Sequence, residues 1–132
     1  MSKLIANYIA YWKRAFDFKG RSSRSEYWYA VLGTIIVSLI IMIVLAFIGG
    51  IFNVIGISFS GAASVIYSVY YILSYIASIS LSVRRLHDIG LTGWLYLIVF
   101  TGIGSIALLV MACMDSQAGY NQWGANPKQQ NY

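Results

Sequence analysis

The sequence predicts an all-α integral membrane protein, with an N-terminal interfacial amphipathic helix followed by three transmembrane helices. Of its 132 residues, 59% are hydrophobic and only 10% are charged, whereas soluble proteins have about 45–50% apolar and about 25% charged residues. A small soluble domain could not bury that much apolar surface. Three uncharged apolar stretches, at 28–50, 64–83 and 94–114, each reach the roughly 20 residues that cross a bilayer. We expect a single membrane domain over 1–132 with a polar tail at 115–132.

Residues 2–18 predict the amphipathic helix. Leu4, Tyr8, Tyr11 and Trp12 fall on one helical face, and the charged residues fall on the other. The segment is too polar to span, so it is expected to lie at the interface with its aromatic rings at headgroup depth. An amphipathic helix packed on the rest of the protein is the alternative.

The start of the first span is marked by a capping box. Ser23 followed by Glu26 predicts that the helix begins at Ser23 or Arg24. Small residues recur on one face of the span and predict a helix-packing surface: Ala30, Gly33, Thr34 and Ser38. Large residues are expected to face lipid on the other side: Leu32, Ile35, Leu39, Met42 and Ile43. Residues 48–63 are rich in glycine and serine and predict a loop or a frayed helix end.

The second span is two-sided. One face gathers the hydroxyl-bearing residues Tyr67, Ser68, Tyr71, Tyr75 and Ser78. Hydroxyl groups without partners are costly in lipid, so this face should contact protein or a wet cavity. We expect the tyrosines to pack on the small face of the first span; a polar path through the membrane is the alternative.

The third apolar segment has Gly102-Ile103-Gly104 at its centre. Two glycines in that place predict a kinked span. The alternative is a re-entrant hairpin whose turn is buried in protein. The choice between them decides on which side of the membrane the tail lies.

Basic residues predict the orientation. Six of the nine Lys and Arg residues precede the first span, two follow the second, and none lies between these spans. The positive-inside rule places the N-terminus and residues 84–88 in the cytoplasm and residues 48–63 outside. The chain is therefore expected to be a multi-pass plasma-membrane protein. This distribution is not a nucleic-acid-binding pattern.

A candidate binding site follows from this topology, since it brings two charged segments to one membrane surface. The residues are Arg21, Arg24, Glu26, Arg84, Arg85, His87 and Asp88. We expect Glu26 to pair with one arginine and Asp88 with another, so that the N-terminal segment is held to residues 84–88. The surplus positive charge is then available to anionic lipid headgroups or to an acidic partner.

Three segments together resemble a known family. They are residues 18–28 around Gly20-Arg21-Ser22, residues 84–94 with Arg-Arg-Leu-His-Asp and a later Gly-Trp, and the tail that contains Asn121, Gly124, Asn126 and Pro127. Their order and spacing resemble the small bacterial inner-membrane proteins called domain of unknown function family 805. The resemblance implies an inner-membrane location and no particular reaction. The family tends to have a proline where Thr101–Gly104 stands, and an Asp where Asn126 stands.

Three classes of function remain open at this point. Because acidic residues are few and no nucleophile or phosphate-binding loop is recognisable, we expect no catalytic residues, metal or cofactor. The leading hypothesis is a non-enzymatic component or regulator that binds membrane lipids, a protein partner or further copies of itself. A small oligomeric transporter or channel lined by the Tyr/Ser face, and an enzyme acting on lipid headgroups, are the alternatives.

Overall fold

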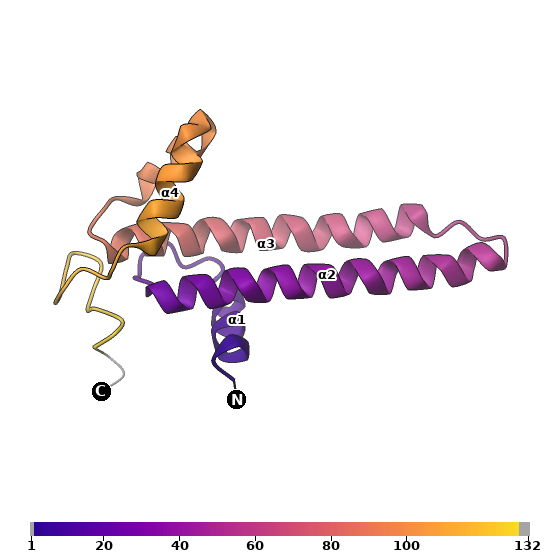
Figure 1. Ribbon diagram of the computed structural model, residues 1–132, viewed down its shortest axis with the longest axis horizontal. Helices are drawn as coiled ribbons and strands as arrows, with labels where there is room; N and C mark the ends of the chain where they lie inside the picture. Colours follow the sequence, from indigo (N-terminus) through magenta and orange to yellow (C-terminus); the bar gives the residue numbers. More distant parts are fainter. Residues whose placement is uncertain (1, 130–132) are drawn as a thin grey trace.

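The computed structural model describes residues 2–129 and is helical. Its elements are α1 (Lys3–Lys13), α2 (Arg24–Val54), α3 (Ser60–Asp88), the 3-10 helix η1 (Gly93–Thr101) and α4 (Ile103–Cys113). Helices α2 and α3 form a long antiparallel pair, and every other element gathers at the end of the pair where α2 begins and α3 ends (Figure 1). The molecule thus has a bare two-helix stem and one elaborated end.

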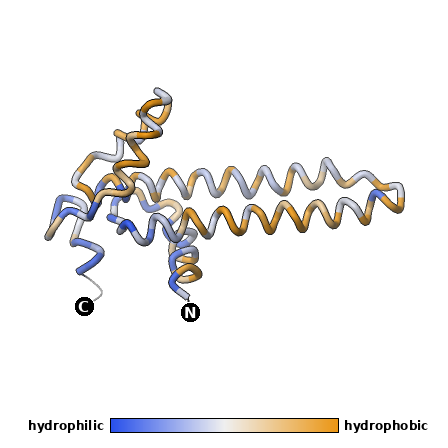
Figure 2. Tube along the Cα trace, viewed as in Figure 1, coloured by the Kyte–Doolittle hydropathy of each residue, from blue (hydrophilic) through white to orange (hydrophobic). Residues whose placement is uncertain are grey.

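Helices α2 and α3 are the two elements in the described part of the chain that are long and apolar enough to cross a membrane. They have 31 and 29 residues, more than the roughly 20 that a 30 Å hydrocarbon core requires. The stem is apolar along most of its length, and polar residues concentrate at the elaborated end (Figure 2). The predicted lipid-facing residues of the first span, such as Leu39 and Ile43, are indeed exposed.

The capping box is confirmed. Ser23 accepts a hydrogen bond from the Glu26 amide, and the Glu26 carboxylate accepts one from the Ser23 amide. Helix α2 therefore begins at Arg24. It continues to Val54, so the connection to α3 occupies only residues 55–59, less than the predicted loop at 48–63.

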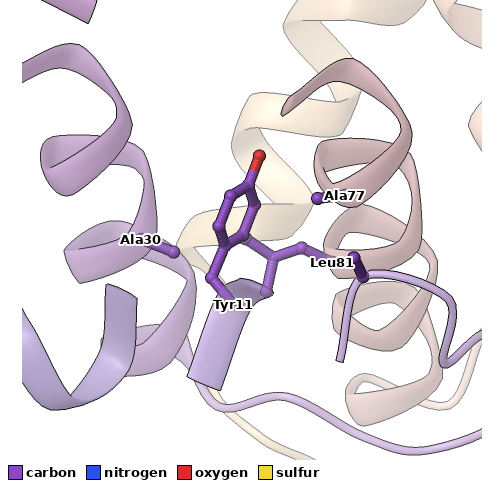
Figure 3. Packing of buried hydrophobic residues seen from close by; sticks show 5 residues of the cluster. Tyr11, Ala30, Ala77 and Leu81 are labelled. Atoms are coloured by element: carbon purple, nitrogen blue, oxygen red, sulfur yellow. The ribbon is translucent and has the colours of Figure 1, made fainter. Parts of the chain in front are cut away.

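A small core forms where α1 crosses the helix pair. Tyr11 lies between Ala30 of α2 and Ala77 and Leu81 of α3 (Figure 3). Its hydroxyl donates to the Ser74 carbonyl at 2.6 Å, so the polar end of a buried ring is satisfied. Gly33 provides room for the neighbouring ring of Tyr8. The small face of the first span is thus used for packing, as the sequence predicts.

The rings that fill that face are not the predicted ones. Tyr67, Tyr71 and Tyr75 are exposed, the last two by 58% and 45%. Their expected place is taken by Tyr11, from α1, and by Tyr70, whose hydroxyl accepts a hydrogen bond from Ser38 at 3.4 Å. The physical reason is that α1 contacts both α2 and α3 and presents its own aromatic face to them.

Helix α1 is shorter than the predicted 2–18 segment and packs on protein. Its rings at Tyr8, Tyr11 and Trp12 contact one another and the helix pair. The apolar residues Ile5 and Ile9 remain exposed. The aromatic face of α1 therefore packs on the rest of the protein, which was the alternative to an interfacial helix.

The third apolar segment is not one kinked helix, so that prediction was wrong. Helix η1 ends at Thr101, Gly102 adopts a left-handed φ of 74°, and α4 returns along η1. A side chain at Gly104 would overlap the backbone of Ile98, so the two arms touch closely. With 11 residues, α4 is about 16 Å long, at 1.5 Å per residue. A fold with three spanning helices is not confirmed, and the geometry is that of a helical hairpin.

Candidate functional site: a buried arginine cluster

Residues 84–88 are the last turns of α3 and not a loop, and most of their charge is buried. Arg84, Arg85 and Asp88 are 1%, 2% and 0% exposed, and Arg21 from the segment before α2 is 5% exposed. We call these four residues the arginine cluster. Buried charges are tolerated only when they are paired and hydrogen-bonded, so each needs an identified partner.

Asp88 is the counter-charge of two arginines. Its Oδ1 accepts from Arg21 Nε at 3.1 Å, and its Oδ2 accepts from Arg85 Nη1 and from the Ser116 hydroxyl. The predicted ionic link between the N-terminal segment and the end of α3 is therefore present. The predicted role of Glu26 differs, because its ion-pair partner is Arg14, at 3.9 Å, and none of the cluster arginines.

Arg84 has no carboxylate partner among residues 2–129 and is held by neutral oxygen atoms. Its Nη1 donates to the Arg14 and Asp17 carbonyls at 2.6 and 2.7 Å, and its Nε donates to Ser22 Oγ at 3.0 Å. The Ser80 hydroxyl, one helical turn earlier, bonds to the same two carbonyls. Arg84 therefore fixes the turn that follows α1.

That turn also has its own anion. Burial raises the pKa of Asp17, but hydrogen bonds from the Lys19 and Gly20 amides and from Arg14 outweigh it and hold the pKa below its usual value. Asp17 is therefore ionised at neutral pH, and it orders residues 17–20, from which the chain enters the cluster at Arg21.

The tail is organised around Arg21. Its Nη1 donates to the Gly119 and Gly124 carbonyls at 3.0 and 3.1 Å, and its Nη2 donates to the Gln117 carbonyl at 2.7 Å. Arg21 is 96 to 103 positions away from these residues. The tail is therefore held to the rest of the fold between Gln117 and Gly124.

His87 completes the contact between the tail and α3. Its Nδ1 lies 3.1 Å from the Gly20 carbonyl, and its ring stacks on Trp123 with centroids 4.4 Å apart. The Asn121 side chain donates to the His87 carbonyl at 2.9 Å. In the family-like tail, Asn121 thus contacts α3 and Gly124 contacts Arg21. Asn126, which Pro127 follows, is buried and accepts a hydrogen bond from the Lys128 amide.

Of the seven predicted site residues, five converge and two do not. Arg21, Arg84, Arg85, His87 and Asp88 form one buried assembly. Arg24 is exposed and donates to the Cys113 carbonyl at 3.3 Å, and Glu26 caps α2. Sequence reasoning missed the contributions of Arg14, Ser22, Ser80 and Ser116; only Ser80, four residues before Arg84, had a helical spacing that signals contact.

The second candidate set lies on the stem. Tyr71 and Tyr75 stack on each other with ring centroids 6.5 Å apart, and both, with Tyr67 and Ser68, are on the surface. Ser78 is half-buried, 2.9 Å from the Tyr11 hydroxyl. We call the exposed Tyr67, Ser68, Tyr71 and Tyr75 the tyrosine–serine face. Within residues 2–129 there is no group of three His, Cys, Asp or Glu side chains that could hold a metal ion.

Known proteins resemble this chain over almost all of its length. The family model described as "Protein of unknown function (DUF805)" matches residues 15–125. The inner membrane protein YhaI of Escherichia coli K12 is 30% identical over 122 residues, which cover 92% of this chain and 94% of YhaI. The inner membrane protein YhaH of the same strain is 30% identical over 129 residues, covering 96% and 93%. No solved structure matches. The chain therefore belongs to the DUF805 family of proteins of unknown function.

Proposed function

We propose that the protein is a non-enzymatic component of the bacterial inner membrane that binds another membrane-spanning helix through the tyrosine–serine face of α3. The observation that carries this proposal is the exposure of that face on a helix long enough to span. Tyr71 and Tyr75 are 58% and 45% exposed. The Tyr75 side chain has Tyr96 as a neighbour, whereas the Tyr71 hydroxyl has no water to bind at bilayer depth. A polar group without a partner is costly there, and a second helix with polar side chains supplies the partner.

The arginine cluster supports a structural rather than a catalytic role for the charged groups. Asp88 is occupied by two guanidinium groups and a serine hydroxyl. A general base must reach the proton that it abstracts, and a fully buried, fully paired carboxylate does not. The channel hypothesis is less favoured for one copy of the chain, because Tyr71 and Tyr75 face outward and enclose nothing.

The topology that we propose has two spans and a re-entrant hairpin. Positive-inside counting places the N-terminus in the cytoplasm. Because the η1–α4 hairpin returns the chain to the same end, the tail joins Arg21 on the cytoplasmic side. The two arms touch at Gly104, but the turn at residues 101–103 is exposed. Irregular backbone at membrane depth must be covered by protein, so this topology requires a partner that covers the turn.

Anionic lipid binding is assigned to the exposed cations at this end. The guanidinium groups of the arginine cluster are occupied by protein oxygen atoms, whereas Lys13, Lys19 and Arg24 are exposed. Basic residues near a membrane surface contribute about 1 kcal/mol each to attraction by anionic lipids. The proposed lipid contact is therefore electrostatic and does not need the geometry of Arg84 or Arg85.

Photocrosslinking in native membranes tests the proposed function. Benzoylphenylalanine replaces Tyr71 or Tyr75, and the matched control replaces Val69, an exposed apolar residue of the same helix. We expect adducts with a membrane protein from positions 71 and 75 and adducts with lipid alone from position 69. A Tyr71→Cys variant in a Cys113→Ala background identifies a second copy of the chain by disulfide-linked dimers. Lipid adducts alone at all three positions would refute the proposal.

A further inference from the structure

A cavity of about 440 Å³ lies beside the stacked rings of His87 and Trp123. Its wall comes from four elements, the segment before α2, α3, η1 and the tail, and includes Phe18, Val83, His87, Trp94, Leu97 and Trp123. Ligand pockets in proteins have volumes of about 300–1,000 Å³ and are mainly apolar, with a few polar groups that fix the ligand. This cavity has that size and composition.

The cavity wall includes the polar side chains of His87, Thr92 and Tyr96. Hydroxyl groups both donate and accept, whereas an unprotonated imidazole nitrogen only accepts. His87 is 6% exposed, and its Nδ1 contacts the Gly20 carbonyl. Its Nε2 has no hydrogen-bond partner within residues 2–129. A Cβ placed on Gly93 would lie 2.6 Å from Val83 Cγ1 and 3.3 Å from this nitrogen, so the absence of a side chain at Gly93 leaves space beside both Val83 and Nε2.

The contact at Nδ1 decides what Nε2 can bind. A carbonyl oxygen only accepts, so Nδ1 carries the proton that it donates to Gly20. Burial of the residue favours the neutral imidazole. Nε2 then carries a lone pair, and its complement is a hydrogen-bond donor.

We propose that this cavity binds a membrane amphiphile that bears a hydroxyl group, with the hydroxyl donating to His87 Nε2. The apolar part of the ligand lies against the rim, where Trp94, Leu97 and Phe18 are 79%, 54% and 41% exposed. Exposed apolar residues around the opening allow entry from the lipid phase. This site is separate from the tyrosine–serine face and does not depend on the function proposed for it.

Paired photoreactive ligands test the chemistry. The protein is placed in nanodiscs made of phosphatidylcholine, because this lipid has no free hydroxyl group. Two diazirine-labelled ligands, a long-chain monoacylglycerol and a long-chain hydroquinone, are each compared with their fully O-methylated forms, and adducts are located by mass spectrometry. We expect about tenfold less labelling of the cavity by the methylated forms, the loss that one hydrogen bond of ordinary strength causes. The more strongly labelling ligand identifies the source of the hydroxyl.

Variants test the role of His87. His87→Phe keeps a flat ring for Trp123 and removes the acceptor, and Gly93→Ala adds a methyl group next to Nε2. Each should reduce labelling by the free hydroxyl ligands to the level of the methylated ones. Gly61→Ala, in open space on the same helix as His87, should label as the wild type does. Equal labelling of the wild type by hydroxyl and methylated ligands overturns the proposal whatever the variants do, as does stronger labelling by a long-chain phosphate ester.

Discussion

Arg21 Nε lies 3.1 Å from Asp88 Oδ1, in a pair that 67 sequence positions separate and that is almost completely buried. This contact joins the segment before α2 to the end of α3. Through the other nitrogens of Arg21 it also joins the tail. The elaborated end of the molecule is therefore one unit built on a buried charge pair, and its stability depends on that pair being complete.

Replacing Asp88 by Asn should be strongly destabilising. Arg21 and Arg85 would lose their shared counter-charge while remaining buried, and breaking a buried pair in this way costs about 3–5 kcal/mol. Thermal or denaturant unfolding in detergent measures the loss. Asp115→Asn is the matched control, since Asp115 pairs with Lys128 at an exposed position and should change stability little. Comparable losses in both variants would contradict the structural role of Asp88.

Two Arg→Lys variants separate structure from lipid binding. Arg84→Lys keeps the charge but loses the Nε and Nη1 contacts, so we expect a loss of about 3 kcal/mol, given about 1.5–3 kcal/mol for each hydrogen bond to a charged group. Arg24→Lys should leave stability unchanged, because Arg24 is exposed. In a flotation assay with anionic liposomes, neither variant should reduce binding, whereas Arg24→Gln should. If the Arg84→Lys variant is folded but binds anionic liposomes less than the wild type does, the arginine cluster itself binds lipid, contrary to this proposal.

Two glycines of α2 predict opposite effects of the same substitution. At Gly33, a new Cβ would lie 2.7 Å from the Tyr8 ring, and we expect a loss of about 1–2 kcal/mol from overpacking. At Gly50 nothing lies within 4 Å, so alanine should stabilise the helix by up to about 1 kcal/mol. Melting temperatures of Gly33→Ala and Gly50→Ala in the same detergent test this. A gain at both positions would show that α1 does not pack on α2 as described.

The sequence predicts the local features of this fold well. The capping box at Ser23 and Glu26 depends on contacts within one turn. The small and large faces of α2 follow from the helical spacing of residues within one segment. The link between Arg21 and Asp88 was also accessible, because topology places both segments at one surface and few acidic residues are present to pair with the arginines.

What the sequence could not show depends on contacts between distant segments. Residues 94–114 have the length and composition of a span, and only the approach of Gly104 to Ile98 reveals the hairpin. Periodicity places Tyr67 and Tyr71 on one side of α3. The tyrosine of α3 that contacts α2 is instead Tyr70, which bonds to Ser38, and Tyr11 from α1 fills the space next to Ser74. The burial of Arg84 was missed for the same reason, since its partners are backbone carbonyls that carry no sequence signal.

We propose that the segment before α2 and the tail lie on the same, cytoplasmic side of the membrane because residues 93–113 form a hairpin. Single cysteines at Ser2, Ser58 and Gln129, all exposed, in a Cys113→Ala background test it by labelling with a membrane-impermeant maleimide in intact cells and in inverted vesicles. We expect Ser2→Cys and Gln129→Cys to react only in inverted vesicles and Ser58→Cys to react only in intact cells. Labelling of Gln129→Cys in intact cells, with Ser2→Cys protected, would show that the third segment crosses the membrane and that the tail lies outside.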